Sequence, residues 1–214
     1  MAGDLISPIV FSPEFLGCMP FIYKEEGGDT NDKHDSGSET RKGIIQREYD
    51  AFRKSKGEPL QTVFAASDAE IQEIYWFQYW LPNCPQVRIG GDLCLFNFQI
   101  NAGVTEAVKI LQRAVNVPDD GHFGLITKAA CDAAEPHKLI YAFTLKEEAF
   151  YRSLKTFKYF GKDWIGRCER CEALALQMLQ KSVTPPVQNM PPVAPATSAD
   201  AQKAVAEKTG AYHV

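Results

Sequence analysis

The sequence lacks a long hydrophobic run and an excess of positive charge. No apolar stretch approaches the roughly 18 residues that a membrane span needs, and the longest one near the start, LISPIVF, is interrupted by Pro8. This stretch has no basic residue before it, so we expect synthesis in the cytoplasm without a cleaved signal peptide. The formal net charge of -4 argues against a nucleic-acid partner, which usually requires a basic surface. We therefore expect no stable membrane insertion and no nucleic-acid binding.

Cysteine and histidine are too scattered to predict a disulfide framework or a metal site. The 214 residues include six cysteines and four histidines. Only CERC, from Cys168 to Cys171, has suggestive spacing, and it lacks the second pair of ligands that a zinc site requires. The acidic residues between 29 and 39 do not follow the spacing of a calcium-binding loop. We expect buried thiols, no metal and no organic cofactor.

Apolar residues recur at helical spacing from Phe15 to Ser182, which predicts a mainly α fold. In the first helix Pro20 interrupts the pattern, so we expect that helix to begin at or near Pro20. The segment 93–103 is dense in apolar residues and is also compatible with a strand. Helices are predicted over residues 20–26, 44–57, 67–80, 105–115, 125–134, 144–157 and 168–181.

Two helix starts carry the spacing of a capping box, in which a Ser or Thr and a Glu three residues later bond each other's backbone. The pairs are Ser67 with Glu70 and Thr144 with Glu147. Beyond residue 182 the character changes, because TPPVQNMPPVAPATSADAQ holds five prolines and almost no large apolar residue. Such a segment cannot bury enough surface to offset its chain entropy, so residues 183–214 are predicted to form a flexible Pro/Ala-rich tail.

The stretch KEEGGDTNDKHDSGSETRKGI carries the residues with the clearest chemical potential. Glu25 and Glu26 end a predicted helix at a Gly-Gly pair, where the negative end of the helix dipole favours a protonated carboxyl group. A protonated carboxylic acid is what a glycosidic oxygen needs from a general acid. The residues that follow include four candidates for a second catalytic carboxylate, namely Asp29, Asp32, Asp35 and Glu39. The alternative interpretation of the stretch is a solvated acidic loop.

This stretch resembles the signature of glycoside hydrolase family 108, the bacterial and phage N-acetylmuramidases. The family pattern is approximately E-G-G, a short spacer, then D-P-G-G-x-T-x-x-G-I. The matching positions are Glu26, Gly27, Gly28, Asp35, Gly37, Thr40, Gly43 and Ile44. Ser36 stands where proline is usual and Ser38 where the second glycine is usual.

The resemblance extends over roughly Phe15 to Leu174. IYWFQYW is similar to the family's I-Y-x-x-x-Y-W helix, and LFNFQINAG to its F-D-x-x-x-N-x-G segment, with Asn97 in place of aspartate. AVKILQRAVNVPDDGHFGLITKAA resembles the peptidoglycan-binding region predicted after the family's hydrolase half. FYRSL and GKDWIGR resemble its last elements, through Tyr151, Trp164 and Arg167.

The resemblance implies a mainly α, lysozyme-like fold with two helical lobes. The lobes would be a catalytic muramidase lobe over 1–100 and a peptidoglycan-binding-like lobe over 101–182, followed by the tail. It implies hydrolysis of the β-1,4 bond between N-acetylmuramic acid and N-acetylglucosamine, with Glu26 as general acid and with Asp35 and Thr40 as further catalytic groups. The separation of the carboxylates would decide between retention and inversion, and the sequence leaves that open.

Four further residues are candidates for glycan binding, namely Tyr75, Tyr79, Trp80 and Asn101. A helix-spaced aromatic stripe is also typical of a core, and Asn101 could instead cap the next helix. We expect a monomer that acts in the periplasm or on the cell wall, as an endolysin beside a holin, with a secretion apparatus, or as an antimicrobial effector with an immunity protein. The alternative is a catalytically inactive protein that binds the cell wall or the secretion machinery.

Overall fold

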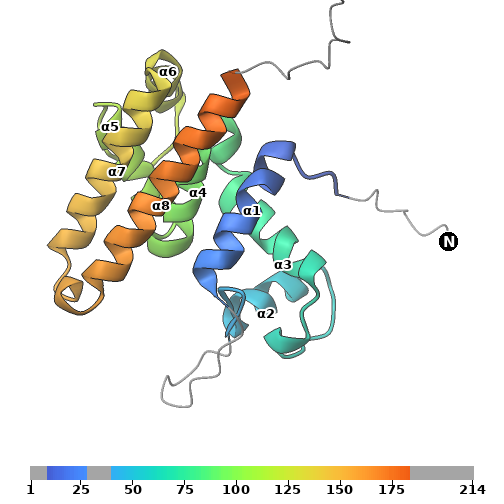
Figure 1. Cartoon of the computed structure of the whole chain (residues 1–214). Helices are drawn as coiled ribbons and strands as arrows, with labels where there is room; N and C mark the ends of the chain where they lie inside the picture. The colour runs from blue at the N-terminus through green and yellow to red at the C-terminus, as the bar shows by residue number, and fades with distance from the viewer. Residues whose placement is uncertain (1–8, 28–39, 184–214) are drawn as a thin grey trace, which may run out of the picture. The chain divides into compact units, whose positions relative to one another are not determined.

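The computed structural model describes residues 9–27 and 40–183, and these are mostly helical, which confirms the predicted fold class (Figure 1). The described residues form one compact unit, and the division into lobes at residue 100 stays a prediction. The predicted tail, apart from Val183, lies outside the described residues. The elements are α1 (Pro13–Glu26), β1 (Thr40–Arg41), β2 (Ile44–Ile45), α2 (Gln46–Ser55), the 3-10 turn η1 (Val63–Ala65), α3 (Asp68–Ile74), the π-helical turn η2 (Tyr75–Trp80), the 3-10 turn η3 (Cys84–Gln86), α4 (Gly91–Ala102), α5 (Val104–Ala114), α6 (Leu125–Ala133), α7 (Pro136–Ser153) and α8 (Phe157–Val183).

Helix α1 begins earlier than predicted, because its first turn has a strong start signal. The Ser12 side chain accepts a hydrogen bond from the Phe15 amide, and Pro13 takes the first helical position, where a proline costs nothing. Pro20 lies inside the helix. The expectation that the helix begins near Pro20 was therefore wrong. Burial of side chains on both sides of the proline outweighs the lost backbone hydrogen bond; these are Phe15, Cys18, Met19, Phe21 and Ile22.

The segment 93–103 is helical, so its interpretation as a possible strand was wrong. Helix α4 is buried on every side over Gly91–Gln99, and a helix without a polar face shows no amphipathic stripe in the sequence. Figure 1 shows α4 surrounded by α5, α7 and α8. This position explains why the only signal in the sequence was a continuous apolar run.

The capping box of Ser67 and Glu70 is present in both directions and starts α3. The one predicted at Thr144 and Glu147 was wrong, because α7 begins eight residues earlier with Glu135 as its cap. Thr144 instead donates its hydroxyl to the Ile140 carbonyl within the helix, at 3.1 Å. Helix α8 likewise begins at Phe157, well before the predicted start at Cys168.

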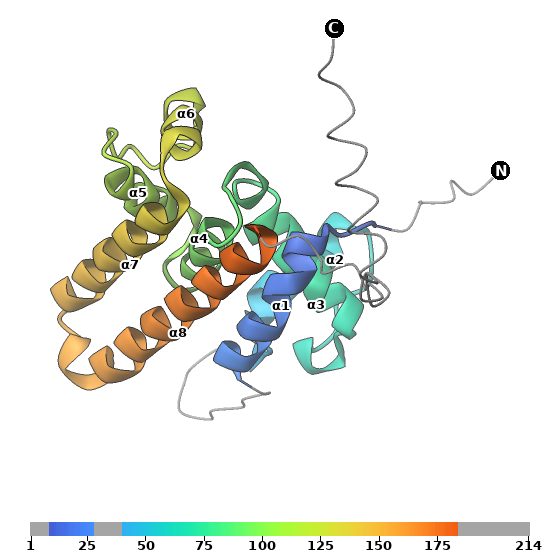
Figure 2. The same ribbon diagram turned by 45° about the horizontal axis from the view of Figure 1, so that its top comes forward.

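One hydrophobic core runs from Phe15 in α1 to Leu179 in α8 and joins the two halves of the sequence. Helix α1 lies between α8 and the region of α2 and α3 (Figures 1 and 2). All six cysteines are buried, as the sequence predicts, and they are unbridged. Among the described residues no helix is long and apolar enough to cross a membrane. In the same residues no group of three or more histidine, cysteine or acidic side chains could hold a metal ion.

Candidate active site

Glu26 is the last residue of α1, and its position is fixed by the way that helix ends. Gly27 follows with φ of 75°, a left-handed conformation that favours glycine. The Glu26 side chain is 16% exposed. It therefore lies at the negative end of a helix dipole and largely out of water.

Arg167 of α8 holds the Glu26 carboxylate from a position 141 residues away in the sequence. Its Nη2 donates to Glu26 Oε1 at 2.6 Å, and its Nε donates to Asn97 Oδ1 at 2.8 Å. Asn97 is fully buried, and its Nδ2 has no hydrogen-bond partner among the described residues. The family resemblance led us to expect aspartate at position 97. Because Asn97 is neutral, it orients the guanidinium group of Arg167 without forming a second ion pair that would compete with Glu26.

A short hairpin packs its tip against the same carboxylate. Strands β1 and β2 pair antiparallel, and the turn residues Lys42 and Gly43 have φ of 47° and 81°, which is the backbone of a type I′ turn. A Cβ on Gly43 would lie 2.8 Å from Glu26 Oε2 and 2.6 Å from the Tyr75 hydroxyl. Glycine is therefore required here both by the backbone and by the contact. The Tyr75 hydroxyl donates to the Lys42 carbonyl at 2.6 Å and fixes the turn.

Tyr75 and Tyr79 continue the site away from Glu26. Their ring centroids are 6.0 Å apart, and both belong to η2, the π-helical turn that replaces the end of the predicted helix. The Tyr79 hydroxyl donates to Glu48 Oε1 at 2.9 Å. Burial, followed by the charge of Glu26, raises the pKa of Tyr75; burial, followed by Glu48, raises the pKa of Tyr79. Both hydroxyls therefore remain protonated donors at neutral pH.

Glu48 is a residue that the sequence analysis missed. It lies in α2 and belongs to no motif, and its bond to Tyr79 connects it with the site. Arg167 was noted only as part of the family resemblance, without a role. A pairing between α1 and α8 has no signal in a single sequence, because the partners are far apart in the chain.

Glu25, the neighbour of Glu26, is engaged by a different arginine. Arg170 binds it with two hydrogen bonds, from Nε to Oε1 at 2.8 Å and from Nη2 to Oε2 at 2.7 Å. The bond to Arg170 lowers the pKa of Glu25. Glu25 is therefore held as a carboxylate, which makes it a poor general acid.

The other predicted site residues lie in several places. Asp35 is outside the described residues, and Thr40 is half-buried in β1 of the hairpin. Tyr75 and Trp80 are 0% and 1% exposed, so both pack in the core, whereas Tyr79 is half-buried. Asn101 is exposed near the end of α4 and donates to the Asn97 carbonyl at 2.9 Å.

The structure thus brings together a largely buried carboxyl group, an arginine that fixes one of its oxygens, and a glycine turn and a tyrosine hydroxyl beside the other. This arrangement suits proton donation to a leaving oxygen, which is the task of the general acid in a glycoside hydrolase.

Comparison with known proteins agrees. Residues 19–103 match the model of the family described as Glycosyl hydrolase 108. A solved structure from Brucella abortus, that of SagA, superposes with a TM-score of 0.69 at 29% sequence identity, over 79% of this chain and 98% of the SagA chain. No protein of curated function matches significantly.

Residues 19–103 thus match the glycosyl hydrolase 108 family model, and the protein is a glycoside hydrolase with the predicted helical, lysozyme-like fold. The family resemblance inferred from the sequence is confirmed. The family match ends at residue 103, so the peptidoglycan-binding-like character of the region beyond it stays a prediction.

Proposed function

We propose that the protein is an N-acetylmuramidase that hydrolyses the β-1,4 bond between N-acetylmuramic acid and N-acetylglucosamine in peptidoglycan. Glu26 acts as the general acid and protonates the leaving oxygen. The observation that carries this proposal is the environment of Glu26 within the family domain, with one oxygen bound by Arg167 and the other beside Gly43 and Tyr75.

Arg167 fixes the rotamer of Glu26, so that the oxygen beside Gly43 and Tyr75 is the one free to present the proton. Binding of a glycan would exclude the remaining water from this carboxyl group.

The remaining roles follow the family resemblance. Asp35 and Thr40 stabilise the positive sugar or position the attacking water, and Tyr79 and Asn101 contact the glycan. Tyr75 supports the hairpin from within the core and is not assigned a glycan contact. The substrate places the protein's action at the cell wall, in lysis or in wall remodelling during secretion.

The test is hydrolysis of purified peptidoglycan by the wild type, Glu26→Gln and Glu25→Gln, with the fragments identified by mass spectrometry. Removal of a general acid costs roughly 10²–10⁴ in rate, so Glu26→Gln should lose at least a hundredfold. Glu25→Gln should remain within about twofold. The wild type should release fragments that end in reducing N-acetylmuramic acid.

Two results would contradict the proposal. Fragments that end in reducing N-acetylglucosamine would mean that a different bond is cleaved. Wall binding without hydrolysis by any of the three proteins would favour the inactive wall-binding alternative.

A further inference from the structure

A cavity of about 620 Å³ lies at the end of α1 opposite to Glu26. Ser12 and Glu14 contribute to its wall from the first turn of the helix. Glu14 precedes Glu26 by twelve residues, or about 18 Å along a helix axis. The cavity is therefore separate from the candidate active site, and its volume is typical of small-molecule sites, which span roughly 300–1,000 Å³.

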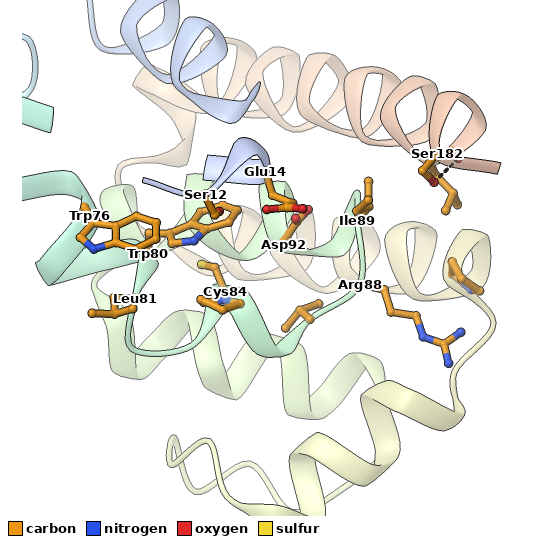
Figure 3. A pocket seen from close by; sticks show the side chains of 14 residues that line it. Ser12, Glu14, Trp76, Trp80, Leu81, Cys84, Arg88, Ile89, Asp92 and Ser182 are labelled. Atoms are coloured by element: carbon orange, nitrogen blue, oxygen red, sulfur yellow. Dashed lines mark hydrogen bonds between the residues drawn. The ribbon is translucent and has the colours of Figure 1, made fainter. Parts of the chain in front are cut away.

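Most of the cavity wall is apolar, as in ligand sites generally. Trp76 and Trp80 lie next to each other at one side (Figure 3). The apolar side chains around them are Leu81, Pro85, Val87, Ile89 and Leu179.

Two carboxyl groups, those of Glu14 and Asp92, lie together in this apolar wall (Figure 3). Asp92 is 2% exposed, and its Oδ1 accepts the backbone amides of Gly90 at 2.8 Å and Leu93 at 2.7 Å. Burial, with a contribution from the charge of Glu14, raises the pKa of Asp92 to about 7. Asp92 is thus about half protonated near pH 7, and a cation placed beside it would favour its charged form.

No cation of the described cavity wall is directed at these carboxyl groups. Arg88 is the one basic residue among the lining side chains. Its guanidinium group points away from Glu14 and Asp92 (Figure 3), and its Nη2 donates to the Asp132 carbonyl at 2.8 Å. A positively charged ligand would therefore supply a cation beside the buried carboxyl group of Asp92 and the exposed carboxyl group of Glu14.

Trp80 adds a hydrogen-bond donor to the same wall. Its side chain is 1% exposed, and its Nε1 is buried without a hydrogen-bond partner among the described residues. An unsatisfied buried N–H is costly and uncommon, and a ligand carbonyl could accept from it after a small shift of the ring. The cavity therefore combines an ammonium-binding end with a donor for a carbonyl and an apolar wall between them.

We propose that this cavity binds a peptide stem of peptidoglycan through the free side-chain amine of its diamino acid. The ammonium group lies between Glu14 and Asp92, and the peptide backbone packs on Trp76 and Trp80 with a carbonyl toward Trp80 Nε1. The charge complementarity stands on the cavity alone, whereas the choice of a peptide stem rests on the proposed function. A second contact with the same polymer would hold the enzyme on the wall between cleavage events.

The probe is the tetrapeptide L-Ala-γ-D-Glu-meso-diaminopimelate-D-Ala with its N-terminus acetylated, so that only the side-chain amine is free. A second peptide has this amine acetylated as well. Titration calorimetry with the full chain should give binding of the first peptide at least tenfold tighter than of the second. Glu14→Gln and Asp92→Asn should each weaken binding of the first peptide at least fivefold, and Asp163→Asn, an exposed change elsewhere on α8, should leave it unchanged.

Thermal unfolding of each variant serves as the control that the variant is folded. Asp92→Asn retains an oxygen for the two backbone amides, and Glu14→Gln tests the pair at an exposed position if Asp92→Asn unfolds. Equal binding of the two peptides, or unchanged binding in both folded variants, would overturn the proposal.

The peptides contain no glycosidic bond, so their binding does not depend on cleavage at Glu26. Glu26→Gln should bind the free-amine peptide as the wild type does. Loss of binding in that variant would place the peptide at the candidate active site and would also overturn the proposal. Peptide binding by a protein that fails to hydrolyse peptidoglycan would contradict only the proposed function.

Discussion

The carboxyl groups at the two ends of α1 have opposite electrostatic environments. At the C-terminal end, Glu25 and Glu26 are each bound by an arginine from α8 at 2.6–2.8 Å. At the N-terminal end, Glu14 lies beside a second carboxyl group, Asp92, and no cation among the described residues of the cavity wall is directed at the pair. The same helix thus has one end at which arginines pair with both carboxylates and one at which no described cation does.

The difference teaches what each end can do. An arginine bound to a carboxylate fixes its rotamer, which is useful where a proton must be delivered to a defined position. A buried carboxyl group without a cation, such as that of Asp92, costs stability in the free protein, and a positively charged ligand would offset that cost. Breaking the matched end should therefore affect catalysis, and changes at the unmatched carboxyl groups should affect ligand binding and the pH dependence of stability.

The largest effect is expected for Arg167→Met. This change leaves the Glu26 carboxylate without its cation and Asn97 without its donor. Loss of the fixed rotamer should lower the rate of peptidoglycan hydrolysis about a hundredfold, with a smaller change in KM. Steady-state kinetics on soluble glycan fragments would measure both.

Two control variants accompany Arg167→Met. Arg167→Lys restores the charge without the forked geometry and should recover part of the rate, while Arg170→Met breaks only the neighbouring pair and should cost less than twofold. A rate in Arg167→Met close to that of the wild type would mean that Arg167 stabilises the fold and does not position the acid.

The next effect concerns the hairpin tip, through Gly43→Ala. The new Cβ would meet Glu26 Oε2 at 2.8 Å and the Tyr75 hydroxyl at 2.6 Å, at a residue with φ of 81°. We expect hydrolysis to fall more than tenfold and unfolding free energy to fall by about 2–3 kcal/mol, from strain and the forced shift of two side chains. Chemical denaturation and kinetics would measure the two losses.

Gly57→Ala is the matched control, because Gly57 has φ of 69° but nothing within 4 Å of a Cβ. It should show the backbone strain alone, about 1 kcal/mol, with full activity. Equal losses in the two variants would mean that the contact with Glu26 is unimportant.

The sequence predicted what depends on local signals. Serine and glutamate at capping-box spacing located the start of α3, and amphipathic patterns located α2, α5 and α6. Glu26, at a Gly-terminated helix end within a family signature, was singled out in the same way, and its catalytic role stays a prediction. In each case the residues that carry the signal are within a few positions of one another.

The sequence could not predict features that tertiary packing decides. Helix α4 has no polar face because it is surrounded, and Pro20 is tolerated because its neighbours are buried. Arg167 and Arg170 reach α1 from more than 140 residues away, and Glu48 reaches the site through its hydrogen bond with Tyr79. A cavity formed by α1, η2, α4 and α8 likewise leaves no local pattern.

A third prediction extends the comparison to Glu147, another poorly matched carboxyl group. Glu147 is 2% exposed, and its Oε1 has no hydrogen-bond partner among the described residues. Burial raises its pKa from 4.5 to about 8, against weaker opposing effects of Cys168 and Arg167 and with a slight increase from Glu148. The raised pKa belongs to the folded state. The contribution of protonated Glu147 to the unfolding free energy is therefore fully present below pH 4.5, its ordinary pKa, and is lost as the pH rises through the folded pKa of about 8.

Glu147→Gln removes this loss. Between pH 5 and pH 8.5 the wild type should lose on the order of 3 kcal/mol more unfolding free energy than the variant, as measured by urea denaturation at several pH values. Glu169→Gln, an exposed change on α8, should follow the wild type. Parallel pH curves for the wild type and Glu147→Gln would refute a buried protonated Glu147.

The smallest effect is expected for Glu25→Gln, which breaks the matched pair that has no catalytic role. Arg170 is half exposed, with 50% of its side chain accessible, and pairs of this kind contribute about 1 kcal/mol or less. The pKa of Glu25 is lowered by Arg170, so its contribution is present above its ordinary pKa of 4.5 and is lost as the pH falls through the folded value. The variant should therefore differ from the wild type slightly at pH 7 and not at all in strong acid. A loss of hydrolysis as large as that of Glu26→Gln would contradict the division of roles between the two glutamates, because adjacent side chains that share one helix end would then both be needed for proton transfer.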